Sequence, residues 1–370
     1  MSVSHILLVC PNDHDPKQIK ATGQLAFALS ANSIQVSIQT GNEEAGALHK
    51  MGSKFHVHHT PPVRMQLPWK TPLATQLRKT IAADETIDLI HFVTITEDFA
   101  ALEAVCHDMN VPTTAQTEDP EAFNIKNIPL WQRQKYMTAL DRLNRIIVPN
   151  NNILEQANNL HLDNLTLVPL GVQMDRFKPV LSKRPTRREL GLPESATLVC
   201  CMADFEPNNR QLDTLRLCMP LGDLLYILFI GRPKDPMYVE RVRAEAQKLG
   251  VEPFVLIRDA VDNPEDYLKA SDVFMLLGGV EERQQTILEA QSCGLPVVIT
   301  PAPSALNLTS GNKTGVVIYP NNTLAKQAVH KLLTDPNFRQ GRSVHARPFV
   351  KKEHGFREMI AAYERVFQNI

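Results

Sequence analysis

The sequence lacks a surplus of charge and a long apolar run. Its formal net charge is -1 over 370 residues, so no overall field attracts the chain to nucleic acid or to an anionic membrane, although a local basic patch is compatible with that balance. The longest apolar stretches, such as residues 224–231, are far too short to span a bilayer. The first residues, MSVSHILLVC, lack the basic segment of a signal peptide and predict a strand. We therefore expect a soluble cytoplasmic protein.

The usual short signatures of metal, redox and nucleotide sites are also missing. The six cysteines form no CxxC pair and no Cys/His zinc spacing, and most lie inside apolar runs. We expect buried, reduced thiols and no structural metal. No GxGxxG follows a predicted strand, and the patterns GxxxxGK[ST], GxSxG and HExxH do not occur. Evidence for function must therefore come from a longer pattern.

Apolar, strand-like runs alternate with helix-like stretches over most of the chain. In the first half the predicted strands are residues 5–11, 34–40, 88–93, 111–117, 145–150 and 165–170. In the second half they are residues 197–203, 224–231, 253–259, 272–278, 295–301 and 315–320. Nearly continuous apolar strands separated by helices predict an α/β fold with parallel sheets covered on both faces. The same architecture appears twice, and the chain is longer than one core usually serves, so we predict two domains.

The segment 178–190 interrupts this alternation. It is basic, contains two prolines and lacks an apolar face, which is typical of a linker. We predict an N-terminal domain over 1–175, a linker over 176–192 and a C-terminal domain over 193–352. Two doubly wound domains are expected to bind ligands in a cleft at the carboxyl ends of their strands.

A longer pattern runs through the second half of the chain. Its parts, in order, are VPLGVQMDRFKP (168–179), RRELGLP (187–193), residues 267–300, TGVVIYP (314–320) and LLTDPNFR (332–339). The most specific part is KASDVF followed by ILEAQSCGLPVVIT, with Glu281 eight residues before Glu289. The sequence thereby resembles the retaining glycosyltransferases of family 4, which have the two-Rossmann GT-B fold. The resemblance implies an acceptor-side first domain, a donor-side second domain, and a C-terminal helix over 353–370 that packs back on the first.

The two glutamates are the residues to which the resemblance assigns the donor. Eight residues are a little over two helical turns, so both carboxylates could share one helix face. By the resemblance, Glu289 accepts hydrogen bonds from the ribose hydroxyls, and Glu281 lies near the hydroxyls or the anomeric carbon of the sugar. An ionised carboxylate can accept from both hydroxyls of a diol. The alternative for Glu281 is a favourable charge at a helix N-terminus.

Between these glutamates the chain departs from the family pattern. The family has Gly-Phe-Gly there, which lets backbone N–H groups approach a diphosphate at a helix N-terminus. This chain has side chains instead, at Glu282, Arg283, Gln284 and Gln285. Arg283 could supply positive charge in exchange for the glycines, but we expect it to be an exposed side chain.

A second departure follows the predicted strand 197–203. The family places an Arg and a Lys on the diphosphate, whereas this chain has Asp204 and Asn209, with Arg210 one place off. Loss of two charge-assisted hydrogen bonds weakens binding by on the order of a hundredfold to ten-thousandfold, and Asp204 is expected to add repulsion. The cations that could replace them are Arg210, Arg232, Arg258 and Lys313.

Two further departures fall in the first domain. Pro16-Lys17 stand near the family's Gly-Gly, and proline removes a backbone donor; Lys17 or Lys20 could restore positive charge, or both could be solvated lysines. Glu118 stands where the family often has a histidine at a strand end. A carboxylate can accept from sugar hydroxyls or act as a general base, and a charged loop position is the alternative. His91 matches another family histidine, but we expect a core-edge side chain.

Together these observations predict a retaining, metal-independent, hexosyltransferase-type glycosyltransferase without a bound cofactor. Its expected partners are a nucleotide-sugar donor and a carbohydrate or lipid-linked acceptor, with no nucleic acid; peripheral membrane contact and a partner subunit are further candidates. The alternatives are a pseudo-glycosyltransferase that serves as a partner subunit or sugar-binding module, and a GT-B sugar-nucleotide epimerase. The predicted catalytic residues are Glu281 and Glu118. The predicted donor-binding residues are Glu289, Gln285, Thr286, Arg210, Arg232 and Gly171.

Overall fold

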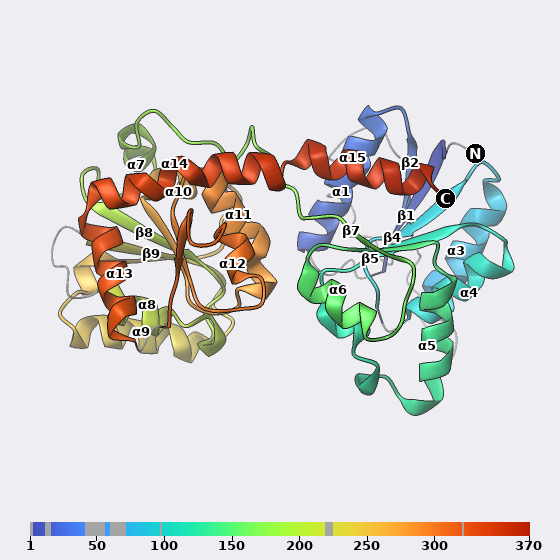
Figure 1. Cartoon of the computed structure of the whole chain (residues 1–370), viewed down its shortest axis with the longest axis horizontal. Coiled ribbons are helices and arrows are strands. Elements are labelled where there is room, and N and C mark those ends of the chain that lie inside the picture. Colours follow the sequence, from blue (N-terminus) through green and yellow to red (C-terminus); the bar gives the residue numbers. More distant parts are fainter. Residues whose placement is uncertain are drawn as a thin grey trace. The chain divides into compact units, whose positions relative to one another are not determined.

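The computed structural model describes residues 3–11, 16–40, 56–59, 72–96, 98–218, 225–319 and 322–370. The chain divides into two compact units, each built on one sheet (Figure 1). Unit 1 comprises Met1–Pro169 with Arg357–Ile370, and unit 2 comprises Leu170–Phe356. In the part of the chain that is described, no helix has both the length and the apolar character needed to cross a membrane.

Unit 1 has a seven-stranded sheet in the order β3-β2-β1-β4-β5-β6-β7, and its neighbouring strands are parallel. The strands are β1 His5–Cys10, β2 Gln35–Thr40, β3 His56–His59, β4 Leu89–Phe92, β5 Thr113–Gln116, β6 Arg145–Val148 and β7 Leu165–Leu167. The helices are α1 Pro16–Ala31, α3 Pro72–Ala83, α4 Phe99–Asp108, α5 Leu130–Arg142, α6 Asn151–Asn158 and α15 Phe356–Gln368, with short turns η2 Pro120–Phe123 and η3 Ile125–Asn127.

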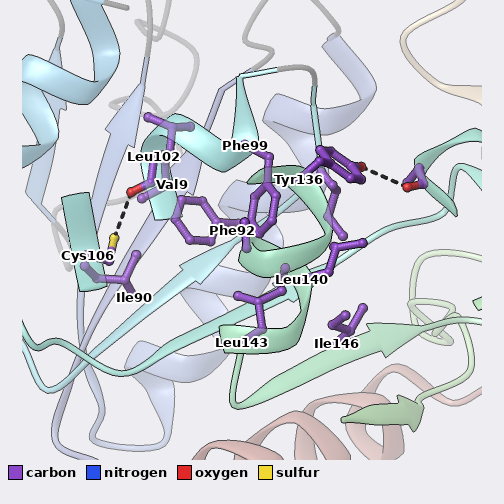
Figure 2. Close-up of a cluster of buried hydrophobic side chains, with 14 of the residues drawn as sticks. Val9, Ile90, Phe92, Phe99, Leu102, Cys106, Tyr136, Leu140, Leu143 and Ile146 are labelled. Carbon is purple, nitrogen blue, oxygen red and sulfur yellow. Dashed lines mark hydrogen bonds between the residues drawn. The ribbon is translucent and has the colours of Figure 1, made fainter. Parts of the chain in front are cut away.

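Aromatic side chains hold the helices of unit 1 on its sheet (Figure 2). The rings of Phe92 and Phe99 meet edge to face with centroids 5.3 Å apart, and Phe99 meets Tyr136 at 6.2 Å. Burial of each such side chain contributes roughly 1.5–3 kcal/mol. The Tyr136 hydroxyl also donates to the carbonyl of Ala122 at 2.8 Å. This bond ties α5 to η2, the turn that follows Glu118.

Unit 2 has a six-stranded sheet in the order β10-β9-β8-β11-β12-β13, also parallel. The strands are β8 Thr197–Met202, β9 Leu225–Ile230, β10 Val255–Arg258, β11 Val273–Leu276, β12 Val297–Ile299 and β13 Gly315–Val317. The helices are α7 Arg184–Glu189, α8 Gln211–Cys218, α9 Pro236–Lys248, α10 Pro264–Ala270, α11 Gln284–Ser292, α12 Ala305–Leu308, α13 Thr323–Thr334 and α14 Pro336–Glu353, with turns η4 Pro207–Asn209, η6 Glu252–Phe254 and η7 Glu281–Arg283. The chain turns back across the sheet between β8 and β11, where doubly wound folds bind ligands at the carboxyl ends of the strands.

Both faces of the unit 2 sheet are covered. Along β8, Leu198 and Cys200 belong to one buried cluster, whereas Val199 and Cys201 belong to another. Successive side chains of a strand point to opposite faces, so an uninterrupted apolar strand requires a core on each side. The six cysteines of the chain are free and buried, which confirms the expectation of buried thiols.

The segment predicted as a linker, 176–192, is folded into unit 2. Arg187 on α7 is only 4% exposed. It donates to the Ala270 carbonyl at 2.8 Å and to Asp272 Oδ2 at 2.7 Å, while Lys183 donates to Asp272 Oδ1 at 2.7 Å. The basic, proline-containing composition suggested a solvated linker, but one largely buried carboxylate at the start of β11 pairs two of its cations. The linker prediction is therefore corrected.

Candidate functional site

Two glycines shape the chain as it leaves the carboxyl end of β11. Gly279 has φ 61°, in the left-handed region that favours glycine. A Cβ added at Gly278 would overlap the carbonyl of Asn208. The absence of side chains at these positions lets the end of β11 pass directly against η4, the turn after β8. The residues that follow β8 and β11 are thus brought into contact.

The two glutamates singled out in the sequence do not lie on one continuous helix. Glu281 belongs to the turn η7, and α11 begins only at Gln284. Arg283 separates them with φ -127° and ψ 24°, outside the helical region. The expectation of two carboxylates on one helix face is wrong, because the non-helical backbone of Arg283 separates η7 from α11.

Three hydrogen-bond donors hold the carboxylate of Glu281. Its Oε1 accepts from the backbone N of Ser304 at 2.8 Å and from the Ser304 hydroxyl at 2.7 Å. Its Oε2 accepts from Gln284 Nε2 at 2.9 Å. Ser304 lies between β12 and α12, so Glu281 links two adjacent strand ends. Because a carboxylate offers about four acceptor sites, the held group can still accept from a ligand hydroxyl.

Three of the predicted donor-binding residues lie together on and beside α11. Gln285 Nε2 lies 3.2 Å from the carbonyl of Gly171 and 3.3 Å from Glu289 Oε1. Gln285 and Glu289 are four residues apart, so their side chains share one face of α11. Thr286, the next residue, is half-buried. The structure therefore brings Glu289, Gln285 and Gly171 to one place in unit 2.

Asp204 is paired rather than free to repel an anion. Arg232 donates to its carboxylate from Nη2 at 2.8 Å and from the backbone N at 3.1 Å, and Lys234 Nζ lies 3.5 Å away. Burial acts to raise the pKa of Asp204, but these hydrogen bonds and the two cations outweigh it and lower the pKa to about 2. The negative charge of Asp204 is thus offset by two cations, contrary to the expectation that it adds repulsion. Arg232, which the sequence offered as a replacement cation, is already paired with Asp204.

The side chain of Asn209 is committed to the loop after β8. Asn209 is 1% exposed. Its amide donates to the carbonyl of Asp204 at 2.6 Å and to Glu206 Oε1 at 3.0 Å. These bonds fix the shape of η4 and leave Asn209 no surface for a ligand.

Arg283 is largely buried, and the expectation of an exposed side chain is wrong. Its side chain is 13% exposed, and Nη2 lies 3.8 Å from Glu206 Oε1. A Cβ added at Gly279 would overlap the Arg283 guanidinium. The side chain therefore covers the glycine turn and meets the loop after β8. Within the stretch where the family pattern has Gly-Phe-Gly, this chain therefore places a cation.

The other predicted cations are solvent-facing. Arg210 is exposed and has φ 53° at the C-terminal end of η4, immediately before α8. Arg258 ends β10 and Lys313 precedes β13, and both are exposed. In unit 1, Lys20 on α1 is exposed, whereas the side chain of Lys17 and the loop before it lie outside the described residues. Of these residues, Arg210 lies nearest in sequence to the loop of Asp204 and Asn209.

Glu118 and His91 belong to unit 1. Glu118 follows β5 and is exposed. His91 is fully buried, with Nδ1 2.8 Å from Thr114 Oγ1 and Nε2 3.1 Å from Gln116 Oε1. Burial lowers the pKa of His91 to about 4. His91 is therefore a neutral core side chain that joins β4 to β5.

Several residues of the site were missed by sequence reasoning. Gln284 was noted only as a departure, while Ser304, Lys234 and Glu206 were not considered. Ser304, Lys234 and Glu206 act through partners on other loops, so no local pattern marks them, whereas Gln284 contacts Glu281 only three residues away. Their shared signal is position, since all of them follow the carboxyl ends of strands.

Known proteins match both units. Residues 21–176 match the family model for Glycosyltransferase Family 4, and residues 182–347 match the model for Glycosyl transferases group 1. HepE of Anabaena, solved with UDP and glucose, has a TM-score of 0.80 at 13% identity and covers 100% of both chains. A glycosyltransferase of Rickettsia africae has a TM-score of 0.83 at 17% identity, with coverage of 100% and 99%.

Curated relatives match over shorter stretches. D-inositol 3-phosphate glycosyltransferase of Xylanimonas cellulosilytica is 25% identical over 214 residues, or 56% of this chain and 51% of that protein. N-acetyl-alpha-D-glucosaminyl L-malate synthase of Bacillus anthracis is 23% identical over 189 residues, or 50% and 48%. The matched region thus spans about half the length of these two relatives, and 37% of another.

Two doubly wound α/β units, similar throughout to solved glycosyltransferases, define a GT-B fold. The chain belongs to the GT-B glycosyltransferases of the family 4 type, since its two halves match the two models of that group. The predicted fold class and family are confirmed.

Proposed function

We propose that this protein is a retaining, metal-independent glycosyltransferase of the hexosyltransferase type. It transfers a sugar from a nucleotide-sugar donor to a carbohydrate or lipid-linked acceptor. The observation that carries the proposal is the joint placement of Glu289, Gln285 and Gly171 in unit 2. They lie on and beside the helix that follows β11, one of the two strands at the point where the chain turns back across the sheet. HepE was solved with UDP and with UDP-glucose, which makes uridine diphosphate the first nucleotide to test.

In this proposal the two glutamates have different tasks. Glu289 accepts from the two ribose hydroxyls, which a carboxylate can bind together with charge assistance. Gln285 orients Glu289 and, with Thr286, lines the donor site beside Gly171. Glu281, held by Ser304 and therefore pre-positioned, accepts from hydroxyls of the transferred sugar. Glu118, on the loop after β5, is proposed as a sugar contact or general base.

The diphosphate is proposed to bind between the loop after β8 and the start of α11. Arg210 and Arg232 come from the first side, and backbone N–H groups of α11 come from the second. Lys234 is added to the predicted set, because the ion pairs of these loops join three cations, Arg232, Lys234 and Arg283, to only two carboxylates, Asp204 and Glu206. The excess of one positive charge, with Arg210, supports binding of an anion in this place.

Nucleotide binding tests the proposal directly. Thermal shift and calorimetry with UDP, GDP and ADP should show a raised melting temperature with one of them, because a ligand that binds only the folded state stabilises it by mass action. Glu289→Ala should abolish most of that binding. Glu252→Ala, a change at an exposed residue that precedes β10 and so lies at the amino edge of the unit 2 sheet, is the matched control and should bind as the unchanged protein does.

The outcomes separate the proposal from its alternatives. No melting shift with any of the three nucleotides at millimolar concentration would refute nucleotide-dependent transfer. Unchanged affinity in Glu289→Ala would refute the ribose assignment alone. Nucleotide binding without donor hydrolysis or transfer to any acceptor would instead favour a pseudo-glycosyltransferase.

A further inference from the structure

A cavity of about 360 Å³ lies in unit 1, between the C-terminal helix α15, the edge strand β7 and the start of β6. α15 is the red helix at the C-terminal end of the chain in Figure 1. The polar side chains that line the cavity are Arg145, Thr166, Arg365 and Asn369, and its apolar side chains include Val168 and Val366. The nucleotide-binding residues proposed above belong to unit 2, whereas every residue that lines this cavity belongs to unit 1.

The strand wall of the cavity is the face of the sheet on which α15 packs. On β6, Ile146 and Val148 belong to the buried cluster that includes residues of α4 and α5. Side chains alternate along a strand, so Arg145 and Ile147 point to the opposite face. Thr166 on β7 pairs with Ile147, which places the Thr166 hydroxyl on the same face as the Arg145 guanidinium. Among the described residues this hydroxyl has no hydrogen-bond partner.

The helix wall is one face of α15. Its cavity residues lie at the spacing of a single helix face and are Ala362, Arg365, Val366 and Asn369. The neighbouring face is fixed on the sheet by Tyr363, whose hydroxyl donates to Gln116 Oε1 at 2.6 Å. Phe367 adds an edge contact to His91, with ring centroids 5.2 Å apart. The fold thus holds both walls of the cavity in place, so a ligand need not order them first.

Two arginines bring positive charge to the cavity from segments distant in the chain. Arg365 Nε donates to the carbonyl of Ala361 at 3.2 Å, and Arg145 Nη1 donates to the carbonyl of Asn144 at 2.8 Å. These bonds hold each guanidinium beside its own backbone, and its remaining N–H groups have no acceptor among the described residues. Neither arginine has an ion pair in that part of the chain. Both side chains are exposed, so a dissolved ligand can reach them.

The chemistry of the lining selects an anion that also carries an organic group. A guanidinium donates two parallel hydrogen bonds to a phosphate or a carboxylate, and two guanidinium groups match a dianion. A phosphate monoester carries a charge of about -1.5 to -2 near neutral pH and presents three acceptor oxygens. Asn369 Nδ2 donates to the Arg365 carbonyl at 2.8 Å, which leaves its Oδ1 to accept from a ligand hydroxyl. Val168 and Val366 offer an apolar surface to carbon atoms.

The size of the cavity favours a compact ligand over a peptide chain. A volume of about 360 Å³ lies at the lower end of the range for small-molecule sites. The edge strand β7 comprises only three residues, Leu165–Leu167. A strand typically has about five to six residues, so this edge is too short to pair with an added peptide strand.

We propose that the cavity between α15 and β7 binds a phosphate monoester of a small polyol or sugar. Arg145 and Arg365 donate to the phosphate oxygens, and the Thr166 hydroxyl completes the set of donors. Asn369 accepts from a hydroxyl of the ligand, and Val366 contacts its carbon skeleton. Such a ligand joins the C-terminal helix to the edge of the sheet. The inference goes beyond glycosyl transfer and does not depend on it.

Calorimetry with glucose 6-phosphate and glycerol 3-phosphate tests the class of ligand. At least one ester should bind, glucose and glycerol should not, and inorganic phosphate should bind more weakly because it lacks the carbon skeleton. The titrations include UDP at saturating concentration, so that a phosphate site in unit 2 is already filled. If neither ester binds at millimolar concentration, the proposal is wrong. Binding of succinate as tight as that of the esters would overturn the choice of phosphate over carboxylate.

Substitutions in the lining test whether these side chains hold the ester. Arg145→Gln with Arg365→Gln should weaken binding by at least about tenfold, because charge-assisted hydrogen bonds are lost. Thr166→Val, which replaces the hydroxyl with a methyl group, should weaken binding by roughly fivefold. Arg357→Gln with Lys135→Gln changes two exposed cations, one on α15 and one on α5, and is the control for charge.

A change in unit 2 separates this cavity from the proposed nucleotide site. Arg210→Gln should leave ester binding as it is, and Arg145→Gln with Arg365→Gln should leave UDP binding as it is. Ester binding that is lost in Arg210→Gln, or that survives the change of both cavity arginines, places the ester elsewhere and overturns the proposal. A protein that binds an ester but no nucleotide would refute the proposed function and support this inference. Circular dichroism melting curves that overlay for all variants establish that the fold is intact.

Discussion

Arg232 donates to both carboxylate oxygens of Asp204, from Nη2 to Oδ2 at 2.8 Å and from Nε to Oδ1 at 3.3 Å. The two residues follow adjacent parallel strands, β8 and β9. Asp204 stands where the family pattern has an arginine, so the chain carries a negative charge at the edge of a proposed diphosphate site. The pairing offsets that charge locally, but it also occupies the cation that the sequence offered as a replacement.

Removing the charge of Asp204 should strengthen diphosphate binding. In Asp204→Asn, Arg232 and Lys234 are released from their carboxylate, and the affinity for UDP should rise by roughly fivefold, the upper range for an exposed ion pair. Affinity for uridine, which has no phosphate, should stay the same. Asp213→Asn on α8, where Arg216 lies 3.9 Å from the carboxylate, is the control. Calorimetry measures both affinities. Weaker UDP binding in Asp204→Asn would show that the carboxylate of Asp204 helps to hold the cations in place for the diphosphate.

Arg210 and Arg232 should contribute unequally to nucleotide binding. Arg210 is exposed beside the same loop, whereas the charge of Arg232 is largely offset by Asp204. Arg210→Gln should therefore weaken UDP binding by roughly tenfold or more, the effect of one charge-assisted hydrogen bond, and Arg232→Gln by less. Arg258→Gln, at the end of β10, serves as the reference for general charge effects. If calorimetry gives the reverse order, Arg232 must exchange Asp204 for the phosphate on binding.

Ser304 should position Glu281 for the sugar and leave the affinity of the protein for the nucleotide unchanged. Ser304→Ala removes the 2.7 Å hydroxyl bond and leaves the backbone bond in place. The affinity for a UDP-sugar relative to UDP should fall by roughly fivefold, corresponding to about 1 kcal/mol for one hydrogen bond. Ser343→Ala, which removes a hydroxyl bond to the Gly294 carbonyl, should not alter this ratio. An unchanged ratio in Ser304→Ala would mean that the Ser304 hydroxyl does not position Glu281 for sugar binding.

The burial of His91 should make unit 1 sensitive to mild acid. Its pKa is lowered from 6.5 to about 4 in the folded chain, so between these values the unfolded chain binds a proton that the folded chain does not. Stability therefore falls as the pH drops from 6.5 towards 4, by about 2 kcal/mol between about pH 7 and about pH 5. In His91→Gln, the free energy of unfolding measured with urea should no longer show this difference between the two pH values. His107→Gln, at an exposed position on α4, should keep it.

Most strands could be read from the sequence because their burial is complete. The apolar run 197–203 contains β8, Thr197–Met202, and the run 5–11 contains β1, His5–Cys10. A strand covered on both faces needs apolar residues at every position, which leaves a continuous signal. The exception is β3, His56–His59, an edge strand with three histidines and one valine. An edge strand pairs on one side only, so its composition need not be apolar, and no pattern predicted it.

Local composition gave wrong predictions of exposure where a residue distant in the chain pairs with the charges of a segment. The basic segment 176–192 looked like a linker, yet Asp272, more than eighty residues away, accepts from both Lys183 and Arg187. The same limit applies to Arg283, which looked like a surface side chain but lies against Glu206 and covers Gly279. A charge is stable in a partly buried place only beside a partner, and the partner is not visible in the local sequence.

The sequence by itself determined the family, the two α/β units and the helix that carries Glu289, because these depend on local apolar periodicity and on a motif contained in one stretch of chain. Only the tertiary structure decided which groups meet: Gln285 with Gly171, Glu281 with Ser304, and Asp204 with Arg232. Each of these pairs joins segments that follow or precede different strands. The last two pairs follow adjacent strands of one sheet, and parallel strands bring their carboxyl ends to one edge whatever their separation in the chain, whereas Gly171 reaches Gln285 from the segment before β8.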